Sequence, residues 1–136
     1  MPGENLDRYR EAIDAWNRHD LVAVLEQTAS DFVFHTAQLF PGIKAVYQGR
    51  EGMVEFWNAF IEEPWALLHI EIDDLTELDD GRVLALLTFT GTGRESGVEV
   101  TVQYAHLCTF RGEQVQRLDG FGDWAEARSA AGVDDA

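Results

Sequence analysis

The sequence is short of several features that would have pointed to particular classes of protein. It contains one cysteine, which excludes an internal disulfide, and only ten basic residues against 25 acidic ones, for a formal charge of −15. An acidic chain without a cluster of lysine and arginine repels a phosphate backbone, because nucleic-acid affinity depends on such clusters. Nucleic acid is therefore a poor candidate partner.

Long hydrophobic runs are also missing. The most apolar stretch, VLALLTF at residues 83–89, has the length of a strand, whereas a membrane-spanning helix needs about 20 apolar residues. The negative charge disfavours anionic membrane surfaces as well. The first ten residues lack the apolar segment of a signal peptide. Together with the single cysteine, these absences predict a cytoplasmic protein without a membrane partner.

Apolar material for a core is plentiful. Hydrophobic residues make up 46% of the chain and aromatic residues 11%, including four tryptophans. A chain of 136 residues is long enough to bury most of this material in one domain. With no internal repeat or low-complexity linker, residues 1–136 are predicted to form a single domain.

Hydrophobic periodicity predicts two helices before the first strand and one after it. Residues 6–16 repeat large apolar side chains at helical spacing, with Asn5 available as N-cap, and Asp20 can cap a shorter helix over residues 21–28. A third helix over residues 49–63 must end at Pro64. The stretch 123–132 predicts a fourth, short helix that Gly132 terminates.

Alternating or continuous apolar patterns predict five strands. They are expected at residues 32–37, 68–73, 83–90, 98–110 and 115–121, with tight turns between the last four. The run 83–90 is apolar on both parities, which is typical of a central strand covered on both faces. The order predicts an α+β domain with a largely antiparallel sheet and its helices on one face.

A histidine interrupts the apolar face of residues 98–110. Seven residues share the inward parity: Val98, Val100, Val102, Tyr104, His106, Cys108 and Phe110. A buried neutral histidine can act as general base, general acid or hydrogen-bond donor near neutral pH. It can equally be a core histidine that a tyrosine, a carbonyl or a water satisfies. Cys108 is interpreted as a small buried hydrophobic residue.

Asp119 meets His106 only in one register of the last hairpin. A two-residue turn at Gly112-Glu113 places Phe110 opposite Val115 and His106 opposite Asp119, which would form a catalytic dyad. A three-residue loop instead brings Leu118 opposite His106 and sends Asp119 to the outer face. Both registers remain open from the sequence.

Large rings surround the position predicted for His106. The candidates for a ligand-binding wall share an inward parity or helical face: Trp16, Phe34, Thr36, Trp57, Trp65 and Tyr104. Solid core packing explains the same pattern. His35 and His69 have outward parities and His19 lies at a helix end, so no metal site is expected.

The outward face of residues 98–110 is neither charged nor fully apolar. It consists of Thr101, Gln103, Ala105, Leu107 and Thr109. Such a surface suits packing against a second copy of the chain, which predicts a homodimer formed through the sheet.

Four stretches together resemble the nuclear transport factor 2-like superfamily, in particular its SnoaL-like and ketosteroid isomerase-like members. They are WNRHD, DFVFHT, YQGREGMVEFW and YAHLCTFRGEQVQRLDGF, in this order within residues 5–132. The resemblance implies a cone-shaped, curved, mainly antiparallel sheet wrapped around three helices, the cystatin-like α+β barrel. It also implies an open end that admits small apolar ligands, and a range of activities from isomerases, cyclases, dehydratases and epoxide hydrolases to binding domains.

The resemblance also implies that the chain lacks residues that the ketosteroid isomerase mechanism requires. The isomerases' proton-shuttling carboxylate falls at Thr36 and their oxyanion-hole tyrosine at Ala12, so ketosteroid isomerase chemistry is ruled out. Their second oxyanion donor falls at His106, while Trp16 and Trp57 match cavity-lining positions. Asp119 has no arginine partner that would match the epoxide hydrolase constellation.

Two hypotheses of function follow. In the first, the protein is a cofactor-independent enzyme in which His106, polarised by Asp119, moves a proton on a small hydrophobic carbonyl compound of polyketide or steroid type, or activates water against it. Isomerisation, cyclisation, dehydration and hydrolysis are the candidate reactions. In the second, the same pocket binds a hydrophobic molecule without catalysis.

Overall fold

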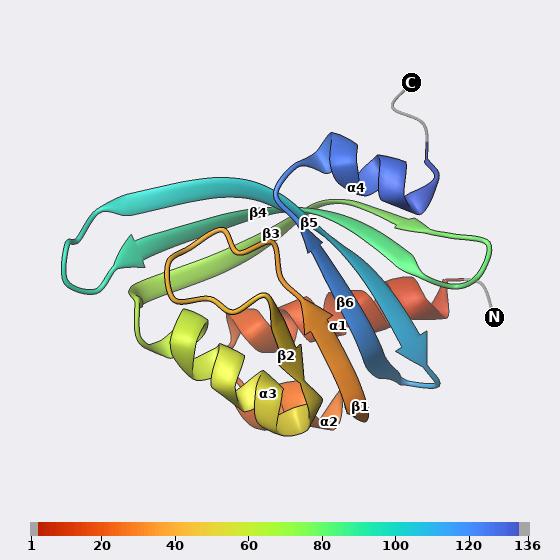
Figure 1. The fold of residues 1–136 in the computed structure, drawn as a ribbon, viewed down its shortest axis with the longest axis horizontal. Helices are drawn as coiled ribbons and strands as arrows, with labels where there is room; N and C mark the ends of the chain where they lie inside the picture. The colour runs from red at the N-terminus through yellow and green to blue at the C-terminus, as the bar shows by residue number, and fades with distance from the viewer. Residues whose placement is uncertain (1–2, 134–136) are drawn as a thin grey trace.

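A curved sheet of six strands dominates the computed structural model, which describes residues 3–133 (Figure 1). The strands lie in the order β2-β1-β6-β5-β4-β3. Their bounds are β1 Thr28–His35, β2 Val46–Gln48, β3 Trp65–Glu77, β4 Val83–Gly93, β5 Glu99–Arg111 and β6 Gln114–Phe121. Every neighbouring pair is antiparallel except β1 and β6. The predicted α+β class and mainly antiparallel sheet are confirmed, but the sheet stays open and does not close into a barrel.

Helices α1 (Glu4–Asn17), α2 (Leu21–Glu26) and α3 (Gly49–Phe56) pack against the inner face of this sheet (Figure 1). The side chain of Asp20 accepts a hydrogen bond from the backbone N–H of Ala23 at 3.1 Å, as predicted for an N-cap. Asn5 is not the N-cap of α1, because the helix already begins at Glu4 and Gly3 takes the N-cap position; the Asn5 amide instead donates to the carbonyl of Gly81 at 2.8 Å. Within residues 3–133, no helix is long and apolar enough to cross a membrane.

The third helix ends in a widened turn. The α-helical part stops at Phe56, and Trp57–Glu62 form a π-helical segment, η1, that closes with a hydrogen bond of 2.9 Å from the Trp57 indole to the Glu62 carboxylate. The rings of Phe56 and Phe60 are stacked, with centroids 5.4 Å apart, and they face the sheet, where they contact the rings of Phe34 and Phe89. Such π-helical insertions occur frequently at functional sites.

The fourth helix, α4 (Trp124–Ala131), contradicts the prediction that all helices lie on one face. It covers the outer face of the sheet (Figure 1) and packs over a second apolar cluster formed by Leu84, Leu86, Ala105, Leu107 and Ala127. The reason is the predicted two-sided apolar character of β4, which needs cover on both faces. Ala105 and Leu107 were expected in a dimer face, but α4 buries both.

Asn17 joins the end of α1 to the edge strand β3. Its amide nitrogen donates to the carbonyl of Ile70 and its amide oxygen accepts from the Ile70 N–H, both at 2.8 Å. The side chain thus satisfies backbone groups that an edge strand otherwise leaves unpaired. These two bonds fix α1, which carries part of the site described below, against the sheet.

We predict that Asn17→Ala lowers the free energy of unfolding by about 1–3 kcal/mol, because two part-buried hydrogen bonds are lost. Asn58→Ala is the matched control, since Asn58 is exposed and its side chain makes no hydrogen bond within residues 3–133. Urea unfolding of both variants measures the difference. Equal stability of the two variants would show that the Asn17 amide does not anchor α1.

Candidate ligand cavity

A cavity of about 100 Å³ lies between the inner face of the sheet, α1, α3, η1 and the loop that joins β1 to β2. The volume is several times the roughly 10–15 Å³ that one water requires on this measure. Eight of the residues that line it carry a phenyl, phenol or indole ring: Tyr9, Trp16, Phe34, Phe40, Phe56, Phe60, Phe89 and Tyr104. The sequence left open whether these rings pack into a solid core or surround a cavity. The structure shows a cavity.

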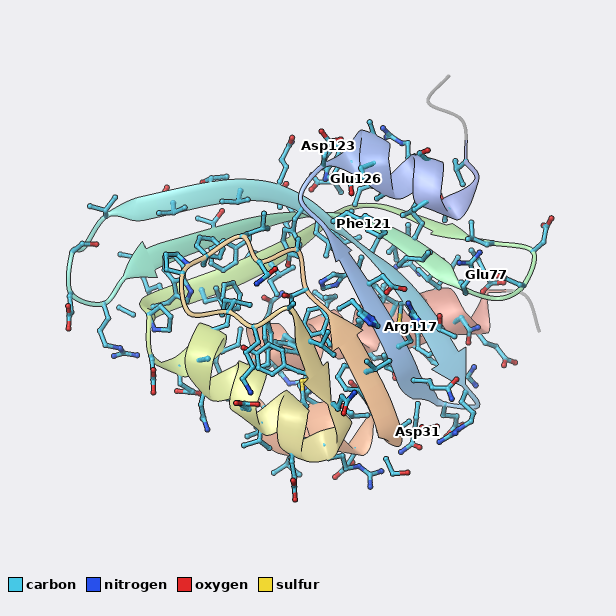
Figure 2. The ribbon with its side chains drawn as sticks, in the orientation of Figure 1. Asp31, Glu77, Arg117, Phe121, Asp123 and Glu126 are labelled. Carbon is cyan, nitrogen blue, oxygen red and sulfur yellow. The ribbon has the colours of Figure 1, made fainter. Side chains whose placement is uncertain are left out.

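Charge is kept away from the cavity. None of the described residues that line it is Asp, Glu, Lys or Arg. Acidic side chains such as Asp31, Asp123 and Glu126 lie instead at the periphery of the molecule (Figure 2). The polar atoms available to a guest molecule consequently belong to uncharged groups.

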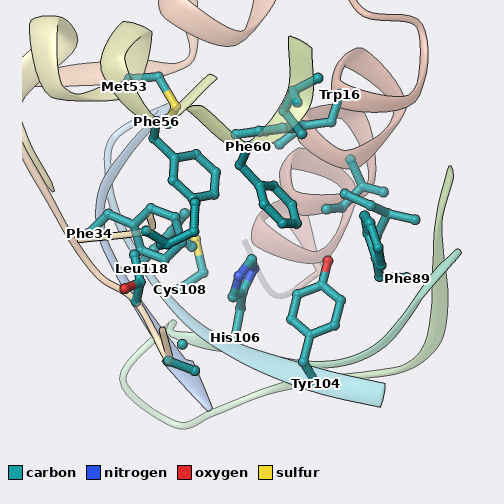
Figure 3. A pocket seen from close by; sticks show the side chains of 18 of the residues that line it. Trp16, Phe34, Met53, Phe56, Phe60, Phe89, Tyr104, His106, Cys108 and Leu118 are labelled. Atoms are coloured by element: carbon teal, nitrogen blue, oxygen red, sulfur yellow. The ribbon is translucent and has the colours of Figure 1, made fainter. Parts of the chain in front are cut away.

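His106 points from β5 into this cavity, as the strand parity predicts (Figure 3). Its ring is half-buried because it borders the hollow. Phe34 meets the imidazole edge-on at a centroid distance of 5.7 Å, and Tyr104 lies on its other side at 5.3 Å. Aromatic rings thus hold the imidazole in place within the wall.

Tyr9 on α1 is the one hydrogen-bond partner of the His106 ring within residues 3–133. Its hydroxyl oxygen lies 3.1 Å from Nδ1 of His106. Tyr9 is one of the large side chains that repeat at helical spacing in residues 6–16, but the sequence did not identify it as a site residue. The available signal was its position on the same helical face as Trp16, which does line the cavity.

Burial favours the uncharged forms of the titratable groups that line the cavity. Desolvation lowers the pKa of His106 to about 4, against a smaller opposing effect of the negative charge on Asp119. Burial raises the pKa of Tyr9 well above its usual range, and the neighbouring Tyr104 and Cys108 add to this effect. Burial also raises the pKa of Tyr104 and that of the Cys108 thiol. At neutral pH the cavity therefore offers hydrogen-bonding groups without a charge.

The structure does not bring Asp119 and His106 together. The turn at Gly112-Glu113 has two residues and pairs Phe110 with Val115, as one of the predicted registers requires. A β-bulge in β6 then leaves Gln116 unpaired, because Phe110 pairs with Val115 but Thr109 pairs with Arg117. The shift by one residue makes Gly120 the partner of His106. The two-residue turn of the first register and the outward Asp119 of the second are both observed, but neither register predicts the partner of His106, because a bulge leaves no signal in the alternation of a strand.

Asp119 consequently lies on the outer face of the sheet. It accepts hydrogen bonds from Nε of Arg117 at 2.9 and 3.2 Å, and its carboxylate lies 3.3 Å from Nδ1 of His35. His35 faces outward, as its parity predicts. The predicted dyad is therefore wrong: His106 lines the cavity, whereas Asp119 lies outside it on the outer face of the sheet.

Four of the six predicted wall residues line the cavity, namely Trp16, Phe34, Thr36 and Tyr104. Trp57 does not, because its ring packs behind Trp16 at a centroid distance of 5.1 Å. Trp65 also lies outside the wall, behind Phe89 at 5.0 Å. The sequence could not tell which member of each aromatic pair would reach the cavity.

Four phenylalanines that the sequence did not single out complete the wall, namely Phe40, Phe56, Phe60 and Phe89. Phe60 was placed on the inner face of its helix but not singled out, whereas Phe40 lies in the loop after β1, where no periodicity indicates burial. The rings of Phe40 and Phe60 are 5.4 Å apart. No group of three or more potential metal-binding side chains occurs in the described part of the chain.

Comparison with known proteins identifies a matching family and similar folds. A family model described as the SnoaL-like domain matches residues 9–118. No match is found among curated proteins. Solved structures resemble the chain over most of its length at low sequence identity.

Three of these structures illustrate how varied the proteins with a similar fold are. An NTF2-like protein of unknown function from Burkholderia pseudomallei is 22% identical, with a TM-score of 0.76 over 93% of this chain and 96% of its own. TerC co-crystallised with polyporic acid is 16% identical, with a TM-score of 0.76 over 92% and 95%. The epoxide hydrolase/cyclase-like enzyme SalBIII is 18% identical, with a TM-score of 0.74 over 88% and 91%.

The lowered pKa of His106 predicts a pH-dependent stability. Between pH 6.5 and about 4 the unfolded chain binds a proton at His106 that the folded protein excludes, so the free energy of unfolding falls as pH falls through this window. Tyr9, Tyr104 and Cys108, which surround the imidazole, titrate above this window. His106→Asn removes the effect and serves as the reference.

We expect the wild type to lose about 2 kcal/mol more than His106→Asn between about pH 7 and about pH 5. Urea unfolding at the two pH values measures this difference. The other three histidines are present in both proteins and cancel. Identical losses would mean that the His106 imidazole is not desolvated.

Proposed function

The chain belongs to the SnoaL-like domain family, and on that footing we propose that it binds a small, uncharged and mainly apolar molecule in the cavity beside His106. The fold alone does not decide this, because the same scaffold carries unrelated functions. The observation that carries the proposal is a hollow lined by aromatic rings in which every polar group is neutral.

The electrostatics select against charged ligands. A carboxylate or ammonium that entered the cavity would lose its hydration without meeting a countercharge, which is costly. The formal charge of −15 also repels anions from the surroundings. The co-crystal of TerC with polyporic acid supports small-molecule binding as a use of this fold.

Catalysis by proton transfer is the second candidate. His106 and Tyr104 side by side could stabilise negative charge on a bound oxygen, and the likeness to the enzyme SalBIII supports this option. However, no carboxylate is found among the described lining residues, and a histidine with a pKa near 4 is a weak base. The loss of Asp119 from the site therefore favours binding over proton abstraction.

Hydrogen exchange separates the two candidates. The α-hydrogens of the neutral naphthyl ketone prodan exchange with D₂O if a bound base removes them, and NMR follows this exchange. We expect no acceleration by the wild-type protein over buffer. Acceleration that His106→Ala abolishes would establish the enzymatic function instead.

Filling the cavity should abolish binding. Ala12 lines the cavity from α1, whereas Ala125 is exposed on α4. We predict that Ala12→Phe weakens prodan binding by at least about tenfold, roughly 1.4 kcal/mol, while Ala125→Phe leaves it unchanged. Fluorescence titration measures both affinities. The proposal fails if Ala12→Phe binds prodan as tightly as Ala125→Phe does.

Self-association remains a prediction for the part of the outer face that α4 leaves open. Thr101 and Gln103 are exposed there, whereas Ala105 and Leu107 are already covered. We expect sedimentation equilibrium to give a dimer and the double variant Thr101→Glu, Gln103→Glu to give a monomer. A monomeric wild type would contradict a sheet-mediated dimer. The cytoplasmic location expected from the sequence likewise stays a prediction.

A further inference from the structure

The Tyr9 hydroxyl has one hydrogen-bond partner within residues 3–133. Tyr9 is 2% exposed, and its only hydrogen bond within residues 3–133 joins its oxygen to Nδ1 of His106 at 3.1 Å. Its raised pKa keeps the hydroxyl protonated at any physiological pH. The hydroxyl therefore carries a hydrogen, in an apolar surrounding, that needs an acceptor.

The direction of this bond follows from counting hydrogens. A neutral imidazole has one protonated nitrogen, which donates, and one bare nitrogen, which accepts. If Nδ1 were protonated, it would donate to Tyr9, and the hydroxyl hydrogen of Tyr9 would be left without an acceptor. If Tyr9 donates to a bare Nδ1, both groups are satisfied. The second arrangement leaves no buried donor unpaired.

A bare Nδ1 places the ring proton on Nε2. This nitrogen has no hydrogen-bond partner in the described part of the chain, and it belongs to a ring that borders the cavity. His106 therefore meets a guest molecule as a hydrogen-bond donor. A neutral imidazole whose tautomer is not fixed by a neighbour can present either a donor or an acceptor.

Tyr104 adds a second donor on the same wall. It lies two residues from His106 on the same face of β5, with the ring centroids 5.3 Å apart, and both side chains rise into the cavity (Figure 3). Its hydroxyl has no partner within residues 3–133, and its raised pKa keeps it protonated. Two neighbouring donors match one oxygen with two lone pairs better than they match another donor.

We infer that Tyr9 is a positioning residue that fixes His106 as a donor toward the cavity, so that the ligand presents an uncharged acceptor oxygen, as a ketone, quinone or ester does, to His106 and Tyr104. This inference rests on the proposed binding function for the ligand class. The role of Tyr9 itself rests only on the geometry of the free protein. The two parts can therefore fail separately.

NMR of the wild type with ¹⁵N-labelled histidine reads the tautomer directly, with the His106→Asn variant assigning the signals. At about pH 7 we expect a protonated Nε2 and a bare Nδ1 at His106. In Tyr9→Phe the bare Nδ1 loses its donor, so we expect a mixture of tautomers. Tyr104→Phe is the matched control and should leave the tautomer unchanged. A protonated Nδ1 in the wild type overturns the role of Tyr9, whether or not Tyr9→Phe folds.

The ligand class is tested with prodan and a naphthalene of the same shape that carries an alkyl group in place of the ketone. We expect Tyr9→Phe and Tyr104→Phe each to weaken prodan binding by roughly two- to tenfold and to leave the affinity for the alkyl compound unchanged. Equal losses for both compounds would overturn the acceptor assignment while the cavity still binds apolar molecules. Failure of the wild type to bind either compound would refute the proposed function and leave the tautomer result standing.

Discussion

A neutral histidine hydrogen-bonded to a tyrosine inside an apolar hollow is the constraint on which the chemistry of this protein depends. Neither Tyr9 nor His106 can ionise readily where it lies, because burial penalises the charged form of each. Each must therefore find its hydrogen bond within the wall or in a guest molecule. A site of this kind recognises polarity and shape without recognising charge, which suits an otherwise highly acidic protein.

The fold assembles this pair from distant parts of the chain. Tyr9 comes from α1, whose end is joined to the edge strand through Asn17, and His106 comes from the middle of β5, 97 residues later. Curvature of the sheet leaves space between the two elements, and aromatic side chains from α3 and η1 bound that space without filling it. On the opposite face, α4 covers β4 and β5, so the strand that carries His106 is supported from behind.

Much of this arrangement is predictable from the sequence, because strand alternation and helical spacing are local patterns. The inward direction of His106, the Asp20 cap and the two-sided burial of β4 follow from such patterns. The separation of Asp119 from His106 does not, since one bulged residue in β6 reverses the face of everything beyond it. Nor does the choice between Trp16 and Trp57 as wall residue, because helical periodicity predicts burial and cannot predict which buried ring borders a void.

The most direct measurement is a crystal structure of the protein grown with prodan. The account predicts electron density for the ketone among the aromatic rings, with its oxygen about 2.7–3.2 Å from Nε2 of His106, the range of an ordinary hydrogen bond. Density for prodan elsewhere on the molecule, or an interior closed by side chains with the imidazole turned away from it, would contradict the account.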